Sequence, residues 1–434
     1  MKRAALSLIF TLMAGHLVAQ SATTLTLEEC LALGANQHPA HAAARAGVAS
    51  ATEAIGEAQA PLYPQLDVTA GYHRWQRRAF LPAGLTLPGR AMPELIGPLD
   101  DWNGALSSRV LLFDSGERRA SVDAAKARRA GAEAEATTVV ADVRLNVHTA
   151  FYALAAARDV QLVAAKNLER AEAHQRLAAA RHAAGAVPQA DVLRTQAEAA
   201  TARLQVINAA SRVRMATGRL NTAMGGPAET PLGITPPPQT PPPPAAVPFD
   251  QSLQRALAHR PELAAGEKRT EAARATVSAA RATRAPKIRA DAALGWRDTV
   301  FLPDTREWQA GVSIDLPIFD AGTRSRRLAR TQSELTREEA MLATRRLQVR
   351  DEVWSAHAEQ DRAWAAIAAN ETSVRAHEES LRVTRERYER GAAVITDLLD
   401  NQAALARAEG SAAEARWSYF AARAAFERAI GGAP

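Results

Sequence analysis

The sequence predicts a mostly helical, internally duplicated chain in which long antiparallel coiled helices are joined to a β-barrel portion. Two observations carry this fold class. The stretch LSSRVLLFDSG (106–116) returns 206 residues later as VSIDLPIFDAG (312–322), each time as an alternating strand that ends in Phe-Asp-small-Gly. About seventy residues without proline follow each copy, and a helix of that length is a rod of roughly 105 Å. Such rods must pack lengthwise, as antiparallel coiled pairs.

The composition agrees with long helices. Only 5% of the 434 residues are aromatic, while alanine, arginine and other strong helix formers are abundant. The formal net charge is +6, and no block of like charge resembles a nucleic-acid-binding arm. We therefore expect no nucleic-acid partner.

The first residues, MKRAALSLIFTLMAGHLVAQSA (1–22), have the layout of a secretory signal peptide: two basic residues, an apolar run and small residues around 19–22. The only cysteine, Cys30, lies beyond the predicted cleavage site, so the segment lacks a lipoprotein cysteine. No other segment has the ~18 uninterrupted apolar residues of a membrane-spanning helix. We expect an exported protein that is not a lipoprotein.

The duplication divides the chain into two repeats, 23–226 and 249–434. GAVPQADVLRTQ (185–196) realigns on GAAVITDLLDNQ (391–402) at the same offset of 206, whereas the upstream parts of the repeats align at an offset of 222. The first repeat also carries a longer loop, 78–98. The proline-dense segment 227–248 between the repeats is predicted to be an extended, semi-rigid linker.

Each repeat contains the same elements in the same order. Two short helices are predicted first, 27–37 and a helix up to residue 60, with counterparts at 249–259 and up to 285. Strand pairs follow at 65–76/102–113 and 287–297/308–319. The long helices are 115–184 and 321–390, and the return helices are 188–224 and 394–430.

The predicted strands have one apolar and one polar face. In the last strand the even positions from Trp308 to Ile318 are apolar or small, while Gln309, Ser313 and Asp315 lie between them. Strands of about ten residues with this pattern and an aromatic near one end are typical of membrane β-barrels, although a soluble half-buried sheet shares the alternation. Four strands cannot close a membrane barrel, for which about eight is the minimum. Either several copies pool their strands, or the strands form something else.

The repeated motifs, LLFDSG and PIFDAG at the junctions and GAVPQADVLRTQ and GAAVITDLLDNQ at the hairpins, resemble the TolC-like outer-membrane factors. The resemblance covers nearly all of the chain after the signal peptide. It implies a homotrimer with a twelve-stranded barrel in outer-membrane lipid and a periplasmic α-helical tunnel. It also implies the function: a passive exit duct of a tripartite efflux pump in a Gram-negative bacterium. The implied partners are a periplasmic adaptor (membrane fusion) protein and an inner-membrane transporter of the RND, ABC or MFS type.

The resemblance assigns roles to two sets of residues. Asp114 and Asp320 stand where a barrel strand becomes a tunnel helix; each carboxylate can cap the helix that follows, and Gly116 and Gly322 let the chain turn. Gly185 and Gly391 mark the hairpin tips at the periplasmic mouth.

The mouth itself is implied to contain a constriction and a latch. Asp397 and Asp400, three residues apart on one helix face, match the constriction aspartates of the family, and rings of carboxylates favour cations. Asp191 and Tyr388 match two members of the gate latch. The arginine often found two residues after the second glycine is absent, because Ala393 stands there; Arg387, Arg390 and Arg194 are the candidate substitutes.

Nothing in the sequence indicates catalysis or a cofactor. His38 and His41 are close in sequence, but no cysteine or carboxylate cluster completes a metal site. The HEES stretch at His377 lacks the second histidine of a zincin, and there is no phosphate-binding loop or nucleophile elbow. We therefore predict a protein that is no enzyme and has neither metal nor cofactor. The alternatives to the efflux duct are the outer-membrane component of type I protein secretion or, in another class, a structural periplasmic coiled-coil or adaptor protein.

Overall fold

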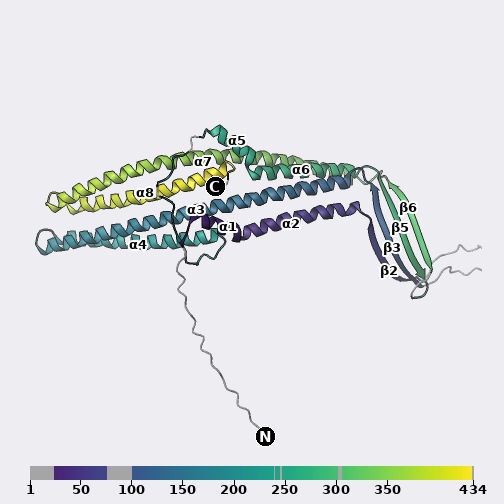
Figure 1. Ribbon diagram of the computed structural model, residues 1–434, viewed down its shortest axis with the longest axis horizontal. Helices are drawn as coiled ribbons and strands as arrows, with labels where there is room; N and C mark the ends of the chain where they lie inside the picture. The colour runs from purple at the N-terminus through teal and green to yellow at the C-terminus, as the bar shows by residue number, and fades with distance from the viewer. Residues whose placement is uncertain (1–23, 76–99, 239, 245–246, 302–304, 433–434) are drawn as a thin grey trace, which may run out of the picture.

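The computed structural model describes residues 24–75, 100–238, 240–244, 247–301 and 305–432. The predicted signal peptide 1–22 and the long loop 78–98 lie outside these ranges. The molecule is a long bundle of helices with a four-stranded sheet at one end and two helical hairpin tips at the other (Figure 1).

Two rods run the length of the bundle, α3 (Glu117–Ala183) and α7 (Thr323–Glu389), each 67 residues long. Each folds back through a hairpin into a 35-residue helix, α4 (Gln189–Ala223) or α8 (Ile395–Ala429). Two shorter helices, α2 (Pro39–Gln59) and α6 (Pro261–Ala282), accompany the rods toward the sheet. The helix α3 packs against α2, α4, α6 and α8.

The short helices continue the return helices end to end. Gly225, just after α4, lies against His38 at the start of α2, and Gly431, just after α8, lies against His259 and Arg260 at the start of α6. Both glycines have positive φ, +89° and +76°, so they end the return helices in the left-handed conformation. Each chain therefore forms four helical columns that lie side by side: α3, α7, α4 stacked on α2, and α8 stacked on α6.

The main hydrophobic core lies at mid-length, where these helix ends meet. Phe151, Leu154, Leu220 and Trp417 are almost fully buried there, next to Cys30 of α1 (Leu27–Gln37). The indole of Trp417 donates to Asp159 at 2.8 Å. On the other side, α5 (Phe249–His259) packs on α7. Away from this core the buried residues of α3 are mostly alanines, which let helices approach closely.

The proline-rich segment differs from the predicted spacer. Its residues Gly233–Ile234 form β4, which pairs in parallel with β1 (Thr24–Leu25). The Arg158 guanidinium donates to the carbonyls of Ile234 and Leu232, and the Tyr419 hydroxyl donates to the carbonyl of Pro242. The linker is therefore held against the middle of the bundle by these hydrogen bonds. The strand escaped prediction because two residues carry no periodic signal.

The sheet is antiparallel, in the order β2 (Gln65–Arg74), β3 (Asp100–Phe113), β5 (Lys287–Asp298), β6 (Arg306–Asp315). A short 3-10 turn, η1 (Ala60–Leu62), leads into β2. The predicted strand 308–319 is four residues too long at its end, because Pro317 has no backbone N–H to give to the ladder. Strands β3 and β5 join the two repeats, and the register contains a bulge at Leu112.

The register places the apolar positions on one face. Val68, Leu106, Leu294 and Trp308 form one row across all four strands. Their exposed fractions are 80%, 43%, 44% and 79%, so no described helix covers this face. The adjoining row on the opposite face is polar or small: Asp67, Ser107, Ala293, Gln309. An uncovered apolar face on strands of 10–14 residues is what a membrane-facing sheet requires.

The end-to-end helix junction is testable at Gly225. Gly225→Ala puts a Cβ 2.7 Å from the Cα of His38 at a left-handed φ. The strain alone costs about 1–2 kcal/mol, so we expect a clearly lower thermal unfolding midpoint for the detergent-solubilised protein. Gly47→Ala is the matched control, because its Cβ meets nothing within 4 Å and alanine favours a helix interior by about 1 kcal/mol. Equal midpoints for the two variants would contradict the end-to-end junction.

Candidate channel and its mouth

At the strand-to-helix junction an aspartate side chain starts each rod. The Asp114 carboxylate accepts hydrogen bonds from the backbone N–H groups of Gly116 (3.1 Å) and Arg118 (2.8 Å). Asp320 does the same for Gly322 (3.0 Å) and Arg324 (2.9 Å). The glycines, at φ +89° and +85°, are the N-cap residues themselves, so the aspartates cap the helices from two positions further upstream.

The turn places two successive residues in the left-handed region. Ser115 has a φ of 55° and Ala321 a φ of 52°, each directly before its glycine. Such conformations are unfavourable for residues with a Cβ, and the hydrogen bonds that the aspartate accepts across the turn stabilise them. The repeated Phe-Asp-small-Gly motif therefore encodes this turn, with a small residue where the strain occurs.

The first junction is also tied to its neighbours. The Arg118 guanidinium donates to Asp114 at 2.8 Å and to the carbonyl of Pro61 at 3.0 Å. Lys287, at the start of β5, forms an ion pair with Glu117. Burial opposes ionisation of Asp114, but the backbone N–H and the guanidinium of Arg118 outweigh it, so the pKa of Asp114 is lowered. The pKa of Asp320 is also lowered, chiefly by the backbone N–H of Arg324.

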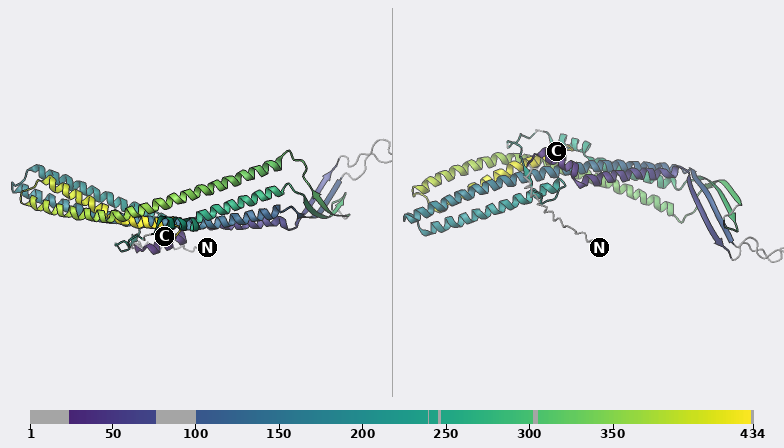
Figure 2. Two further views of the ribbon diagram at one scale, coloured as in Figure 1. Left: turned by 90° about the horizontal axis from the view of Figure 1, so that it is seen from above. Right: turned by 60° about the horizontal axis from the view of Figure 1, so that its bottom comes forward.

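At the other end of the bundle, Gly185 and Gly391 terminate the rods at φ +72° and +76°. The next N–H reaches back to close each helix: Ala186 donates to Arg181 at 2.9 Å, and Ala392 to Arg387 at 2.8 Å. These are the Schellman ends that glycine favours. The two tips lie at the same end of the bundle (Figures 1 and 2).

The two predicted constriction residues lie on the exposed face of α8. Asp397 and Asp400 are both exposed, whereas Ile395 and Leu398 are buried on the opposite face. Among the described residues neither carboxylate has an ion-pair partner. In one chain both charges therefore project away from the bundle.

The two predicted latch residues are not joined within the chain. Tyr388 is 3% exposed, and Asp191 is half-buried in the first turn of α4. No hydrogen bond among the described residues connects them, and the buried Tyr388 hydroxyl has no protein partner. The contact that does reach Tyr388 from the first hairpin comes from a residue that the sequence did not single out.

That residue is Arg181, in the last turn of α3. Its guanidinium donates to the carbonyls of Tyr388 (3.0 Å) and Glu389 (2.7 Å) and lies 5.0 Å from the centre of the Tyr388 ring. A cation at the C-terminus of α7 also opposes the helix dipole. Arg181 aligns with Arg387 at the repeat offset of 206, and this alignment was the one feature of the sequence that could have pointed to Arg181.

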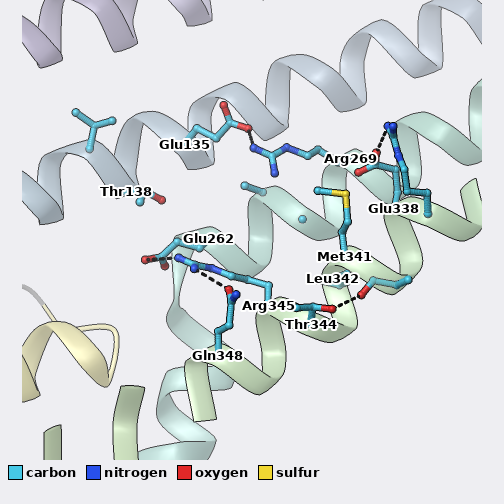
Figure 3. Close-up of a pocket in the computed structure, with 15 residues that line it drawn as sticks. Glu135, Thr138, Glu262, Arg269, Glu338, Met341, Leu342, Thr344, Arg345 and Gln348 are labelled. Atoms are coloured by element: carbon cyan, nitrogen blue, oxygen red, sulfur yellow. Dashed lines mark hydrogen bonds and ion pairs between the residues drawn. The ribbon is translucent and has the colours of Figure 1, made fainter. Parts of the chain in front are cut away.

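A groove of about 660 Å³ opens between α3, α6 and α7 (Figure 3). Arginines and glutamates around it neutralise each other: Arg269 pairs with Glu135, and Arg337 pairs with Glu338 at 2.9 Å. Met341 and Leu342 add apolar surface. No group of three or more His, Cys, Asp or Glu residues in the described part of the chain is arranged to hold a metal. Nor is any described helix both long and apolar enough to cross a membrane.

Comparison with known proteins decides the family. The family model described as outer membrane efflux protein matches residues 34–226 and 252–432, which is most of both repeats. The chain belongs to the outer membrane efflux protein family. This TolC-like family consists of outer-membrane channels, so the protein is an efflux channel of a Gram-negative outer membrane and no enzyme. The family excludes the alternative of a structural coiled-coil or adaptor protein.

Individual relatives agree with this assignment. The protein CyaE of Bordetella pertussis is 31% identical over 394 residues, covering 87% of this chain and 78% of CyaE. The pyoverdine export outer membrane protein OpmQ of Pseudomonas aeruginosa is 27% identical, covering 90% and 81%. The crystal structure of the outer membrane protein VceC from Vibrio cholerae has the same fold, with a TM-score of 0.81 at 21% identity over 94% of this chain and 96% of VceC.

The junction of this efflux channel is testable through Asp114. Asp114→Asn keeps the shape but weakens a buried, charged cap, and losing such a cap costs about 1 kcal/mol at neutral pH. Because the folded-state pKa is lowered, the carboxylate stabilises the protein above its ordinary pKa of about 3.9, and this stability is lost as pH falls through the folded-state value. Thermal unfolding midpoints of wild type and variant should differ at pH 7 and converge in acid.

Asp320→Asn is the matched control for this experiment. Its side chain is 26% exposed against 8% for Asp114, so we expect a smaller loss. A gap between wild type and Asp114→Asn that stays constant from pH 7 into acid would contradict the role of the charge.

Proposed function

We propose that the efflux channel works as a homotrimer, in which the sheets of three copies close one barrel and the helices form one tunnel. The observation that carries this proposal is the pair of open strands: β2 and β6 are the edges of the sheet, and each has a partner on one side only. An open edge is not tolerated in the hydrocarbon region of a membrane, because its N–H and C=O groups lack partners. Three copies supply twelve strands, above the minimum of about eight.

The internal duplication predicts the register in which β6 of one copy would pair with β2 of the next. Strand β3 aligns with β6 at an offset of 206, and β5 aligns with β2 at an offset of 222. The pair Leu106 and Leu294 of β3 and β5 therefore maps onto Val312 of one copy and Tyr72 of the next. The side chains of Val312 and Tyr72 both lie on the apolar face of the sheet, as those of Leu106 and Leu294 do.

This register is testable with paired cysteines. In Val312→Cys with Tyr72→Cys, oxidation in outer membranes should produce covalent species up to a trimer on denaturing gels, because opposite Cβ atoms in a sheet lie about 4.5–5.5 Å apart. Each single variant is a control for the native Cys30, which is buried. Val312→Cys with Ala70→Cys is the register control and should react far less. Stronger reaction of that pair, or a ladder that ends at the dimer, would contradict the proposal.

We further propose that Asp397 and Asp400 form the constriction at the mouth. Three copies of the exposed α8 face would bring six unpaired carboxylates around one axis. Rings of carboxylates concentrate a negative field and favour cations. Asp191 and Tyr388 remain the proposed latch, with Gly185 and Gly391 at the tips where an adaptor would dock.

The constriction predicts a change of ion selectivity. We expect the wild-type channel in a planar bilayer to have a small, cation-preferring conductance, and Asp397→Asn with Asp400→Asn to lose most of that preference. The reversal potential in a salt gradient measures it. Glu386→Gln is the charge control and should keep the preference, because this half-buried carboxylate on α7 is already paired with Arg382 at 2.6 Å. If the aspartate variant keeps the preference too, the constriction lies elsewhere.

The partners follow from the family's role as an exit duct. We propose that a periplasmic adaptor links the helical tips to an inner-membrane transporter of the RND, ABC or MFS type, which supplies the energy. The similarity to a pyoverdine export protein supports small-molecule efflux. Type I secretion of a polypeptide is the second candidate, because the fold itself does not select the cargo. Deleting the gene and comparing drug sensitivity with the secreted proteome separates the two.

A further inference from the structure

The contact that Arg181 makes with the second hairpin is not repeated by the equivalent arginine of the second repeat. Arg387, its equivalent at the offset of 206, is exposed. In the described part of the chain the only hydrogen bond of its guanidinium is a 3.5 Å contact to the carbonyl of Ala392, in its own hairpin. Arg181 instead crosses from α3 to the end of α7 with two shorter bonds.

The duplication indicates where Arg387 would reach. If the first hairpin of a second copy stands beside the second hairpin as the second hairpin stands beside the first, the carbonyls of Tyr388 and Glu389 map onto those of His182 and Ala183 in that copy. The imidazole of His182 then takes the place of the Tyr388 ring under the guanidinium. Both carbonyls belong to the last two residues of α3, where a rod has acceptors without intrahelical donors.

We propose that the closed mouth is held by a ring of six arginine clamps, Arg181 within each chain and Arg387 between neighbouring chains. Each clamp joins one hairpin tip to the next through the terminal carbonyls of a rod. The interchain half of this proposal depends on the proposed trimer. The intrachain half stands on the contacts of Arg181 alone.

The chemistry favours arginine at this position. A planar guanidinium can donate to two carbonyls and lie over a ring at once, whereas a lysine ammonium is a point charge on a flexible stem. The buried Tyr388 ring supplies the platform, and its unpartnered hydroxyl takes no part in the clamp. Along the same seam, Arg170 pairs with Glu409 at 2.7 Å, and Gln402 donates to Asn167 at 3.2 Å. These contacts between α3 and α8 are further from the tip. The clamps can therefore open at the mouth while α3 and α8 stay packed together.

Single-channel recording tests the clamps. Arg181→Ala and Arg387→Ala should each raise the open probability by about tenfold or more, the factor that corresponds to about 1.4 kcal/mol. Arg181→Lys should resemble Arg181→Ala. Arg390→Ala removes the same charge at the same tip, where the described structure shows no side-chain contact to the other hairpin, and should leave the channel closed. Equal effects of Arg181→Ala and Arg390→Ala, or rescue by lysine, would overturn the clamp.

Cross-linking tests the interchain half. A short bifunctional thiol reagent is needed, because an arginine reaches further than the Cα separation of a disulfide, about 4.4–6.8 Å. Arg387→Cys with Ala183→Cys should give a covalent trimer, whereas Arg181→Cys with Glu389→Cys should react within one chain. Arg375→Cys with Ala183→Cys is the control, since residue 375 lies about 18 Å further along α7. No interchain product from the Arg387 pair, in membranes where the Val312 and Tyr72 pair still gives trimers, would overturn the interchain clamp without affecting the trimer.

Discussion

Backbone hydrogen bonding in the membrane is the constraint on which the rest of this structure depends. A sheet in lipid must satisfy every N–H and C=O group, so its strands have to close on themselves. The chain brings four strands with two open edges, and the helices that leave the sheet must then continue around the same axis. The length of the rods, the end-to-end stacking of α4 on α2 and of α8 on α6, and the open face of α8 all fit an arrangement in which each chain is one sector of a hollow cylinder.

The junction between sheet and rod is where this arrangement is most strained. Each strand has to change from an extended to a helical backbone over a few residues, with two residues in the left-handed region. An aspartate upstream of the turn satisfies helix donors that glycine, as the N-cap, has no side chain to satisfy. The motif occurs in both repeats, and in both the arginine four residues after the aspartate adds a second contact.

Local features of this fold were predictable from the sequence because they have local causes. Proline and glycine mark the ends of the helices, period-two alternation marks the strands, and Asp114 and Asp320 are recognisable as caps from the motif alone. Features that depend on which elements meet were not predictable. The pairing of β3 with β5 joins the two repeats, and Arg181 acts on α7 from a helix more than 200 residues away in sequence. The two-residue strand β4 inside a proline-rich segment has no periodic signal at all.

The candidate mouth was predictable only as a set of positions. Asp397 and Asp400 lie on the exposed face of α8, but a single chain cannot bring carboxylates of three copies together. The repeats also differ in charge here: Asp397 aligns with Asp191, whereas Asp400 aligns with Arg194. The first hairpin therefore carries one charge of each sign where the second carries two negative charges. In the proposed trimer the six hairpins would have nearly identical backbones, but this difference would repeat only three times around the axis. The electric field at the mouth would then have threefold symmetry, and the second hairpin rather than the first would select the ions that pass.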